Sequence, residues 1–453
     1  MSCPIESIIQ QAPEVQARID EVEGAVSFHQ LIWAAWRLGI LLAAMIVEEI
    51  LRVRAEEPTT WPPCPQCARK LWSKGFRPRQ MQTILGMIHW KRRIGRCPNG
   101  CGIGQLAPFD EELGIQPHEA SSLELKQMGC LFAIFVPFET ASLLLERLWK
   151  VRVSDNTIWQ WVQQFGAKAI QQLEERLADF EPRDYPNDLL SPAQLQALQA
   201  LIGADGVFAP FRPHGGSPHG KTVWQEVKIG VIARLQRVGK GSGKWVSRLA
   251  QRRLVAYRGD TNNFTPRLLL EGLQQQMCEA RQTIWVSDGS RGLWRIFQGW
   301  FSWHAIGVLD FYHAAENLWK GASSWLDGRT NAARQWFTQA RHRLRHGQLQ
   351  SILNDLTQTL QNPDLDPKAR KAVTNLKNYL TTHVEHMNYE QLKKKGIPLG
   401  SGFVESACKW LIQQRFKCVG MRWSEQGFDH LLHLRLLWVN ERFDTLFVHS
   451  PID

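Results

Sequence analysis

The sequence has 453 residues, of which 44% are hydrophobic, so it can build two or three domains with hydrophobic cores and is not a mostly disordered protein. Its formal net charge is +11, but residues 1–60 hold nine acidic and four basic residues, so the rest of the chain carries +16. A basic body of that size favours a polyanionic partner, most often nucleic acid. The nine cysteines are odd in number and four of them have metal-like spacing, which favours a reducing compartment over a disulfide framework.

Residues 1–60 are predicted to be a helical region. Apolar side chains recur there at helical spacing, for example at Ile32 and Trp36, and Pro58 ends the pattern. Such a segment is typical of a core helix or a dimer-forming helix. The first residues lack the basic region of an export signal, and the most apolar run, residues 38–47, is about half as long as a membrane span. We therefore expect no membrane segment and a cytoplasmic, nucleoid-associated protein.

Residues 61–110 carry two cysteine pairs at the spacing of a zinc ribbon. CPQC contains Cys64 and Cys67, and CPNGC contains Cys97 and Cys101. Each pair sits on a turn that brings two thiolates within about 2.3 Å of one ion, and zinc takes four such ligands in a tetrahedron. The pattern predicts a structural Zn²⁺, and the alternative is four unliganded buried cysteines. Basic residues between the pairs would let the ribbon touch nucleic acid.

Residues 111–181 are predicted to be a helical, helix-turn-helix-like DNA-binding region. One helix is expected over residues 139–150 and the next over residues 155–165, with Ser154 as the N-cap of the second. Polar residues on the second helix suit the reading of base edges, but they are equally ordinary on a protein surface. The Pro- and Asp-containing stretch 182–194 is predicted to be a linker.

An α/β core is predicted for residues 195–313, and three strands in a row begin it. GADGVFAPF carries Asp205, TVWQEVKIGVIARL follows, and RRLVAYRG is the third strand, so hairpin-like connections make an antiparallel meander. The loop between the second and third strands is basic and contains no acid. A solvated loop is the ordinary interpretation, and a clamp for a DNA phosphate backbone is the functional one. The basic residues of this loop are Arg237, Lys240, Lys244, Arg248, Arg252 and Arg253.

Two further strands each end in an aspartate. TIWVSD closes on Asp288, and AIGVLDFYH carries Asp310 and His313. An amphipathic helix over residues 290–301 connects them, which makes a β-α-β unit with parallel strands. Ligands gather at the carboxyl ends of strands in open α/β sheets, so Asp288 is a candidate for chemistry. The alternative is that Asp288 only caps the helix that follows.

Two segments complete the core. Residues 314–398 are predicted to be an almost wholly helical insertion, and residues 399–453 are predicted to be the last part of the core. A closing helix over residues 424–443 is amphipathic, so we expect it to pack on the sheet.

The motif GSGFVESACK opens the last part of the core. Ser401 is expected to cap a helix that carries Glu405 and Lys409 on one face. An ion pair between residues four apart is their ordinary role and contributes a few tenths of a kcal/mol. A place for Glu405 beside the strand-ending acids is the functional alternative.

Three acids would require cations if the fold brings them together. Carboxylates of Asp205, Asp288 and Glu405 about 4 Å apart would repel by roughly 4 kcal/mol per pair at an effective dielectric of 20. Two Mg²⁺ ions would neutralise such a cluster and activate a water or a 3′-hydroxyl for phosphodiester displacement. Hard oxygen ligands favour Mg²⁺ or Mn²⁺ over zinc.

Several motifs in this order resemble those of the DDE transposases of bacterial insertion sequences, in the Mutator-like branch and specifically the ISKra group. The motifs cover most of the chain and are the CPQC ribbon, ADGVFAP, WQEVKIGVI, SDGSRGLW, LDFYHAAENLW, GSGFVESACK and GMRWS. The resemblance implies an α/β fold, with a ribonuclease-H-like mixed sheet that contains a helical insertion and follows a zinc ribbon and a helix-turn-helix-like region. It implies that Asp205, Asp288 and Glu405 are the first, second and third catalytic acids.

The same branch has a C/D(2)H signature after the second acid, and Asp310 and His313 match it in its aspartate form. The resemblance therefore implies that both residues support the metal site. Lys409, on the same helix face as Glu405, is predicted as a further supporting residue. Asp310 is also the main rival of Asp288 for the second catalytic place, because both close a parallel strand.

The function implied by the resemblance is DNA transposition. The protein is expected to bind the terminal inverted repeats of its element, cleave the ends and join the 3′-hydroxyls to target DNA. Its partners would be double-stranded DNA, both element ends and target, and a homodimer or larger assembly would hold two ends together. Two alternatives are a domesticated DNA-binding protein without catalysis and a stand-alone metal-dependent nuclease.

Overall fold

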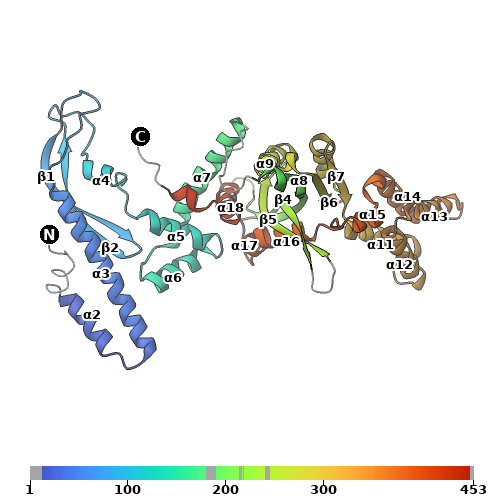
Figure 1. Ribbon diagram of the computed structural model, residues 1–453, viewed down its shortest axis with the longest axis horizontal. Coiled ribbons are helices and arrows are strands. Elements are labelled where there is room, and N and C mark those ends of the chain that lie inside the picture. Colours follow the sequence, from blue (N-terminus) through green and yellow to red (C-terminus); the bar gives the residue numbers. More distant parts are fainter. Residues whose placement is uncertain (1–12, 180–189, 214–216, 218, 240–244, 449–453) are drawn as a thin grey trace. The chain divides into compact units, whose positions relative to one another are not determined.

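A computed structural model describes residues 13–179, 190–213, 217, 219–239 and 245–448 (Figure 1). The chain forms two compact units. The first contains Met1–Gln164 together with Asp444–Asp453, and the second contains Phe165–Phe443. The division falls inside one long helix, α7 (Asp155–Asp179). The predicted linker at residues 182–194 follows this helix, and its residues 182–189 lie outside the described part.

A helical hairpin begins the first unit. It consists of α2 (Pro13–Glu23) and α3 (Phe28–Glu56). Helix α3 starts where the Ser27 hydroxyl accepts a hydrogen bond from the amide of Gln30, at 3.3 Å. An Arg37–Glu21 ion pair of 3.1 Å joins the two helices.

By length and composition, α3 is able to cross a membrane. It is 29 residues long and mostly apolar, and only 6% of its most apolar stretch is buried. The expectation of no membrane segment considered only the run at residues 38–47, and apolar residues on both sides of that run extend it. Core helices of soluble proteins pass the same test, so this property alone does not identify a membrane span.

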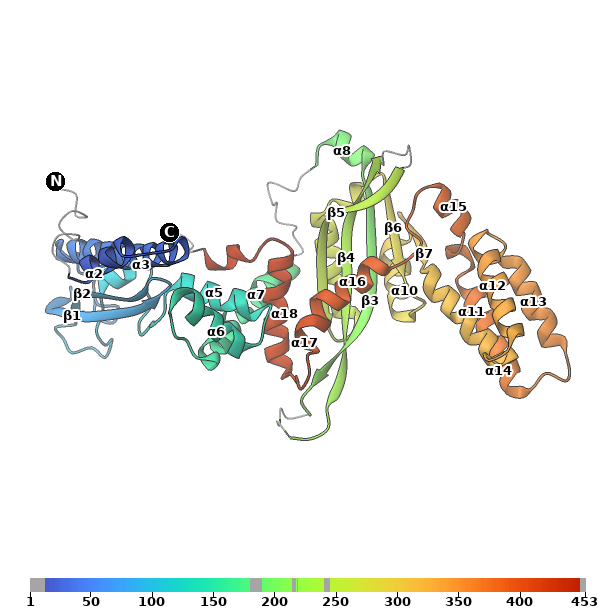
Figure 2. The same cartoon turned by 90° about the horizontal axis from the view of Figure 1, so that it is seen from below.

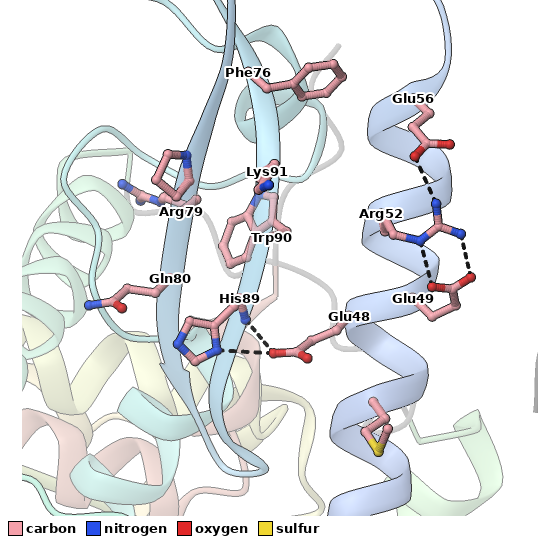
Figure 3. A pocket seen from close by; sticks show the side chains of 12 residues that line it. Glu48, Glu49, Arg52, Glu56, Phe76, Arg79, Gln80, His89, Trp90 and Lys91 are labelled. Atoms are coloured by element: carbon pink, nitrogen blue, oxygen red, sulfur yellow. Dashed lines mark hydrogen bonds and ion pairs between the residues drawn. The ribbon is translucent and has the colours of Figure 1, made fainter. Parts of the chain in front are cut away.

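A two-stranded antiparallel ribbon follows the hairpin. Strand β1 (Trp72–Thr83) pairs with β2 (Gly86–Arg96), and one face of the ribbon packs against α3 around Trp90. The carboxylate of Glu48 on α3 accepts a 2.7 Å hydrogen bond from the backbone amide of His89, and Figure 3 shows this contact. Glu48 therefore satisfies a donor on the open edge of the ribbon, which would otherwise be free to pair with another chain.

The first unit contains several further helices. They are α4 (Pro108–Glu112), α5 (Leu123–Ala133), α6 (Phe138–Trp149), the start of α7, and the short helix η5 (Asp444–Phe447). The amide of Thr157 donates to the Ser154 hydroxyl at 3.1 Å, so Ser154 caps α7 as expected. Helix α6 ends at Lys150 in a left-handed conformation (φ 58°), which turns the chain toward α7.

A five-stranded mixed sheet forms the centre of the second unit, as predicted. Its order is β5-β4-β3-β6-β7. The first three strands are antiparallel neighbours, whereas β6 is parallel to β3 and β7 is parallel to β6. The strands are β3 (Gln199–Phe211), β4 (Val223–Gly239), β5 (Trp245–Arg258), β6 (Gln282–Ser287) and β7 (Ala305–Leu309).

Helices cover both faces of this sheet. On one face α16 (Gly402–Cys408) crosses β3 and β4 (Figure 2). A Cβ atom at Gly203 of β3 would lie 2.2 Å from a methyl carbon of Val404, so only glycine lets α16 approach this closely. Helix α9 (Thr261–Gln274) packs on the other face. It lies so close to β4 that a Cβ atom at Gly230 would be 2.6 Å from a methyl carbon of Leu268.

Several shorter helices complete these layers. They are α8 (Pro192–Ala197), η1 (Met277–Glu279), α10 (Arg291–Ile296), the π-helical turn η2 (Phe297–Phe301), the π-helical turn η4 (Lys409–Gln413), α17 (Gln414–Phe416) and α18 (Glu425–Val439). Helix α18 packs on β5, as expected for the closing helix: the side chain of Asn440 accepts from the Leu254 amide and donates to the Leu254 carbonyl, both at 2.8 Å.

The helical insertion packs beside β7 (Figure 1). It contains α11 (Phe311–Leu326), α12 (Asn331–Arg345), α13 (Leu349–Gln361), α14 (Pro367–Thr382), η3 (Val384–His386) and α15 (Tyr389–Lys394). Leu318, Leu344 and Leu380 are fully buried and belong to the same hydrophobic cluster as Trp285 of β6. The insertion and the sheet therefore share one core.

Candidate active site

Two aspartates occupy neighbouring positions on adjacent parallel strands. The last paired residues of the parallel strands β3 and β6 are Ala204 and Ser287. Asp205 and Asp288 come directly after them, where β6 ends and β3 continues. Tertiary structure thus places the two predicted acids side by side at the carboxyl end of the parallel pair, as the topology of α/β sheets leads one to expect.

Glu405 comes from α16, which lies over the same end of β3. Three residues further along this helix, the Cys408 sulfur is 4.0 Å from a carboxylate oxygen of Asp205. The charge of Glu405 contributes to raising the pKa of Asp205. The three predicted acids therefore belong to one electrostatic site, although they are separated by up to two hundred positions in the sequence.

Burial and mutual repulsion disfavour the ionised form of these acids. Burial, followed by the charges of Asp288 and Glu405, raises the pKa of Asp205 to about 6, against opposing contributions from the Gly206 amide and His313. Burial also raises the pKa of Asp288 above its ordinary value. A site in which carboxylates resist ionisation stabilises a bound cation, because the cation removes the cost of holding the charges together.

The raised pKa makes the stability of the magnesium-free protein depend on pH. A carboxyl group whose folded pKa exceeds its unfolded value destabilises the fold when ionised, so this contribution becomes unfavourable as pH rises from about 4 to about 6. Asp205→Asn is expected to remove it and to raise the stability of magnesium-free protein at neutral pH. We expect a gain on the order of 1 kcal/mol after allowing for solvent screening.

Thermal unfolding of wild type and variant without added Mg²⁺ at pH 4 and pH 7.5 measures this effect, and because protons displace zinc from the cysteines at pH 4 in both proteins, only the difference between the two proteins is compared. The difference in Tm between wild type and Asp205→Asn should be larger at pH 7.5. An equal difference at both pH values would contradict the assignment.

Asp310 occupies a different position from its rival Asp288. Its side chain is fully buried, and one carboxylate oxygen accepts from the amides of Tyr312 (2.6 Å) and His313 (3.0 Å) at the start of α11. The other oxygen accepts from both the amide and the hydroxyl of Ser401, which precedes α16. With four donors on its two oxygens, Asp310 connects the end of β7 to the helix that carries Glu405.

The prediction that Ser401 caps the helix carrying Glu405 is therefore correct only in part. Ser401 is the N-cap residue of α16, but its hydroxyl makes no capping hydrogen bond to that helix and donates to Asp310 instead. Ser401 has φ −88° and ψ 14° instead of the extended backbone that is usual for a capping residue, and its hydroxyl is held by the buried carboxylate of Asp310.

His313 lies between the acids. Its Nε2 atom is 3.9 Å from a Glu405 oxygen, and its charge lowers the pKa of both Asp205 and Asp288. Among the described residues, the carboxyl and imidazole atoms of Asp310, His313 and Glu405 form a group within 4.8 Å, whereas Asp205, Asp288 and Glu405 do not form one that compact. Asp205, Asp288 and Glu405 offer carboxylate oxygens alone, which fit Mg²⁺ or Mn²⁺, whereas a group that includes the His313 imidazole also suits other transition metals.

Lys409 is exposed on the surface of the same helix region. Within the described part of the chain, no ion pair joins it to Glu405. The π-helical turn η4 begins at Lys409, so the spacing of a regular α-helix does not apply beyond this residue.

A polar pocket of about 520 Å³ opens beside Asp205 and Asp288. Its wall includes Glu226 and Lys228 on β4, which form a 2.7 Å ion pair, and Arg295 on α10. None of these three residues was identified from the sequence. Glu226 and Lys228 have the two-residue spacing that places side chains on one face of a strand, and this was the only available signal.

The insertion also contacts the turn that carries Asp288. The indole N–H of Trp294 donates to the Asp288 carbonyl at 2.6 Å, and the Trp294 ring stacks on His386 of η3 at 4.3 Å between ring centroids. A Cβ atom at Gly289 would lie 2.5 Å from the ring of Tyr379. The insertion thus packs against the turn that carries Asp288 through contacts that no local sequence pattern reveals.

The four predicted zinc ligands come together in the first unit. The sulfur atoms of Cys64, Cys67, Cys97 and Cys101 lie within 4.8 Å of one another, and Cys67 and Cys97 are 3.4 Å apart. Four thiolates about 2.3 Å from one tetrahedral ion would be about 3.8 Å apart, so the donor set and its spacing fit Zn²⁺.

Loss of one ligand tests this metal site. Cys67→Ser is expected to release zinc and to expose residues 61–107 to protease, because zinc binding contributes on the order of 10 kcal/mol to folding in small zinc modules. Zinc content by mass spectrometry and limited proteolysis measure both effects. Cys278→Ser, at an exposed cysteine outside the cluster, is the matched control and should keep its zinc. Full zinc content in Cys67→Ser would contradict the site.

The predicted basic loop is largely a β-hairpin. Strand β4 continues to Gly239 and β5 begins at Trp245, so Arg237 lies within β4, and Lys240 and Lys244 lie outside the described residues. Arg248 and Arg252 are exposed. Arg253 is 7% exposed and forms a 3.1 Å ion pair with Glu441, which corrects its assignment to an exposed loop. Alternation along β5 turns Arg253 inward while Arg252 faces solvent.

Comparison with known proteins gives a match among solved structures. No protein-family model matches the sequence, and no curated protein matches it. Among solved structures, the Drosophila P element transposase strand transfer complex is similar over 74% of this chain and 96% of that chain, with 9% sequence identity and a TM-score of 0.34.

Proposed function

We propose that this protein is a DNA transposase that cleaves the ends of its element and joins the 3′-hydroxyls to target DNA. The observation that carries the proposal is the convergence of Asp205, Asp288 and Glu405 at the carboxyl end of β3 and β6. The ordered motifs that resemble the ISKra transposases support it. The mixed sheet and the helical insertion before Glu405 agree with the ribonuclease-H-like core that this resemblance implies.

In this proposal the carboxylates of Asp205, Asp288 and Glu405 would hold Mg²⁺ or Mn²⁺, and the bound ion would supply activation of a water or 3′-hydroxyl and stabilisation of the leaving oxygen. His313 keeps a positive or hydrogen-bonding group near the acids. Asp310 fixes the start of the Glu405 helix. Because burial already disfavours charge on the acids, the site is prepared to exchange protons for cations.

DNA is the proposed partner, both as element ends and as target. The exposed polar residues of α7, Asn156, Gln160 and Gln164, are placed on one side of the helix that Ser154 caps, where they suit base reading. The exposed Arg248 and Arg252 on the hairpin suit phosphate contacts. Two ends must be joined together, so the active assembly is a homodimer or larger, and we place it in the cytoplasm at the nucleoid.

Product analysis tests the proposal. Full-length protein is incubated with labelled element-end DNA and supercoiled target, with or without Mg²⁺ and with no chelator, so that zinc is retained. Joined molecules that need Mg²⁺ are expected. Broken DNA without joined products would favour a stand-alone nuclease, and binding without cleavage in Mg²⁺ or Mn²⁺ would favour a DNA-binding protein that lacks catalysis.

A further inference from the structure

Helix α3 exposes many large apolar side chains that nothing in the described part of the first unit covers. Its 29 residues span about 43 Å, and within it only Ala34 and Ala55 are buried. Trp33 and Trp36 are 42% and 49% exposed, and Ile50 is 47% exposed. A helix that is apolar over most of its surface is stable in water only when something covers it.

Two sides of α3 already have partners within the first unit. Helix α2 packs along its amino-terminal part, where Glu21 pairs with Arg37. From Ala44 onward the ribbon packs on another side, with Ala55 in the ribbon's hydrophobic cluster. Beside that contact is a pocket of about 800 Å³, in which Arg52 pairs with two glutamates of its own helix (Figure 3). The charged residues of the helix thus lie on or next to the occupied sides.

The remaining side carries an uninterrupted apolar stripe. Its positions follow alternating steps of three and four residues, which is the heptad spacing that seats one helix against another. No charged or polar residue interrupts the series. The positions are Trp33, Trp36, Ile40, Ala43, Val47 and Ile50.

We propose that this stripe pairs with the same stripe of a second copy of the chain, to form a two-fold α3–α3′ seam. Because the stripe keeps the three-and-four spacing of a coiled-coil seam, a two-fold axis would set the same row of apolar side chains against itself, with the small Ala43 leaving room near its middle. The inference does not depend on the reaction that the acids perform. It assigns to α3 the role of holding two chains together.

A lipid bilayer is a poorer occupant of the same stripe. Only the part of α3 before Ala44 is free of the ribbon, which is shorter than the about 20 residues of a membrane span. Arg37 and the acidic helix α2 bound to it would have to enter the hydrocarbon with that part. A second copy covers the stripe without breaking either contact.

Sedimentation velocity of the full-length protein tests the seam. Trp36→Glu and Val47→Glu place a charge on the stripe, and both side chains are exposed in the single chain, so its fold should persist with zinc still bound. The matched control is Val26→Glu, because Val26 is 89% exposed but precedes the helix. Wild type and control are expected to be dimers at concentrations on the order of 10 µM, and each stripe variant should raise the dimer Kd by at least about 100-fold.

Three results would overturn the inference. The first is a wild-type protein that is monomeric at this concentration. The second is a set of stripe variants that remain as dimeric as the control. The third is co-sedimentation of wild type with phosphatidylcholine vesicles that is abolished in the stripe variants, which would assign the stripe to a bilayer.

Discussion

Strand transfer is expected to fall by at least about 10²- to 10³-fold in Asp288→Asn, which is the cost of losing one preorganised electrostatic group at a reacting centre. Asparagine has the same shape but no charge, so the turn after β6 and its contact with Trp294 should remain. DNA binding should persist, because Asp288 is an acid and contributes no phosphate contact. The same result is expected for Asp205→Asn and Glu405→Gln.

Gel-based quantification of joined products and a binding assay with end DNA measure the two properties separately. Glu316→Gln is the matched control, since Glu316 is an exposed acid close to His313 that pairs with Lys320. It should retain wild-type joining. Wild-type joining by the Asp288 variant would remove that residue from the catalytic acids.

Asp310→Ala is expected to reduce both stability and joining. Four hydrogen-bond donors would lose their acceptor in a buried place, and each buried unsatisfied donor costs about 1–3 kcal/mol, so we expect a loss of roughly 3 kcal/mol or more. Ser401→Ala removes only one of these donors and should cost about 1 kcal/mol. Urea unfolding measures both losses, and a double-mutant cycle should show strong coupling between the two residues.

Cysteine substitution separates positioning from metal binding at these aspartates. A thiolate at a metal ligand binds softer ions better than Mg²⁺, so Asp288→Cys should regain part of its joining activity when Mn²⁺ replaces Mg²⁺. Asp310→Cys should show no such recovery, because Asp310 acts through Ser401 and the Glu405 helix. Recovery at Asp310 and not at Asp288 would exchange their roles and would make Asp310 the second ligand.

Local patterns in the sequence were sufficient to predict those features that depend on residues close together in the chain. The spacing of the cysteine pairs predicted four sulfurs that the fold does bring together. Alternation and β-branched residues predicted the meander and the parallel pair, and each strand-ending aspartate was found from its place after an apolar run. Ser154 was identified as a cap from its position before a helical pattern.

Other predictions were wrong or incomplete because the features concerned depend on residues far apart in the chain. Arg253 is basic and adjacent to exposed arginines, but the strand extends further than its apolar core suggests, and alternation turns the side chain toward Glu441. Apolar residues in α3 indicated a helix, but their exposure became visible only once α2 and the ribbon occupied definite sides of it.

The sequence by itself determined which residue types are present for the chemistry and which elements carry them, because helix and strand periodicity and ligand spacing are local properties. Tertiary structure alone decided that Asp288 lines the polar pocket while Asp310 is buried against Ser401, and that the insertion contacts the Asp288 turn through Tyr379 and through His386, which stacks on Trp294. These choices rest on hydrogen bonds and packing between segments about ninety residues apart, whose energies exist only when the chain is folded.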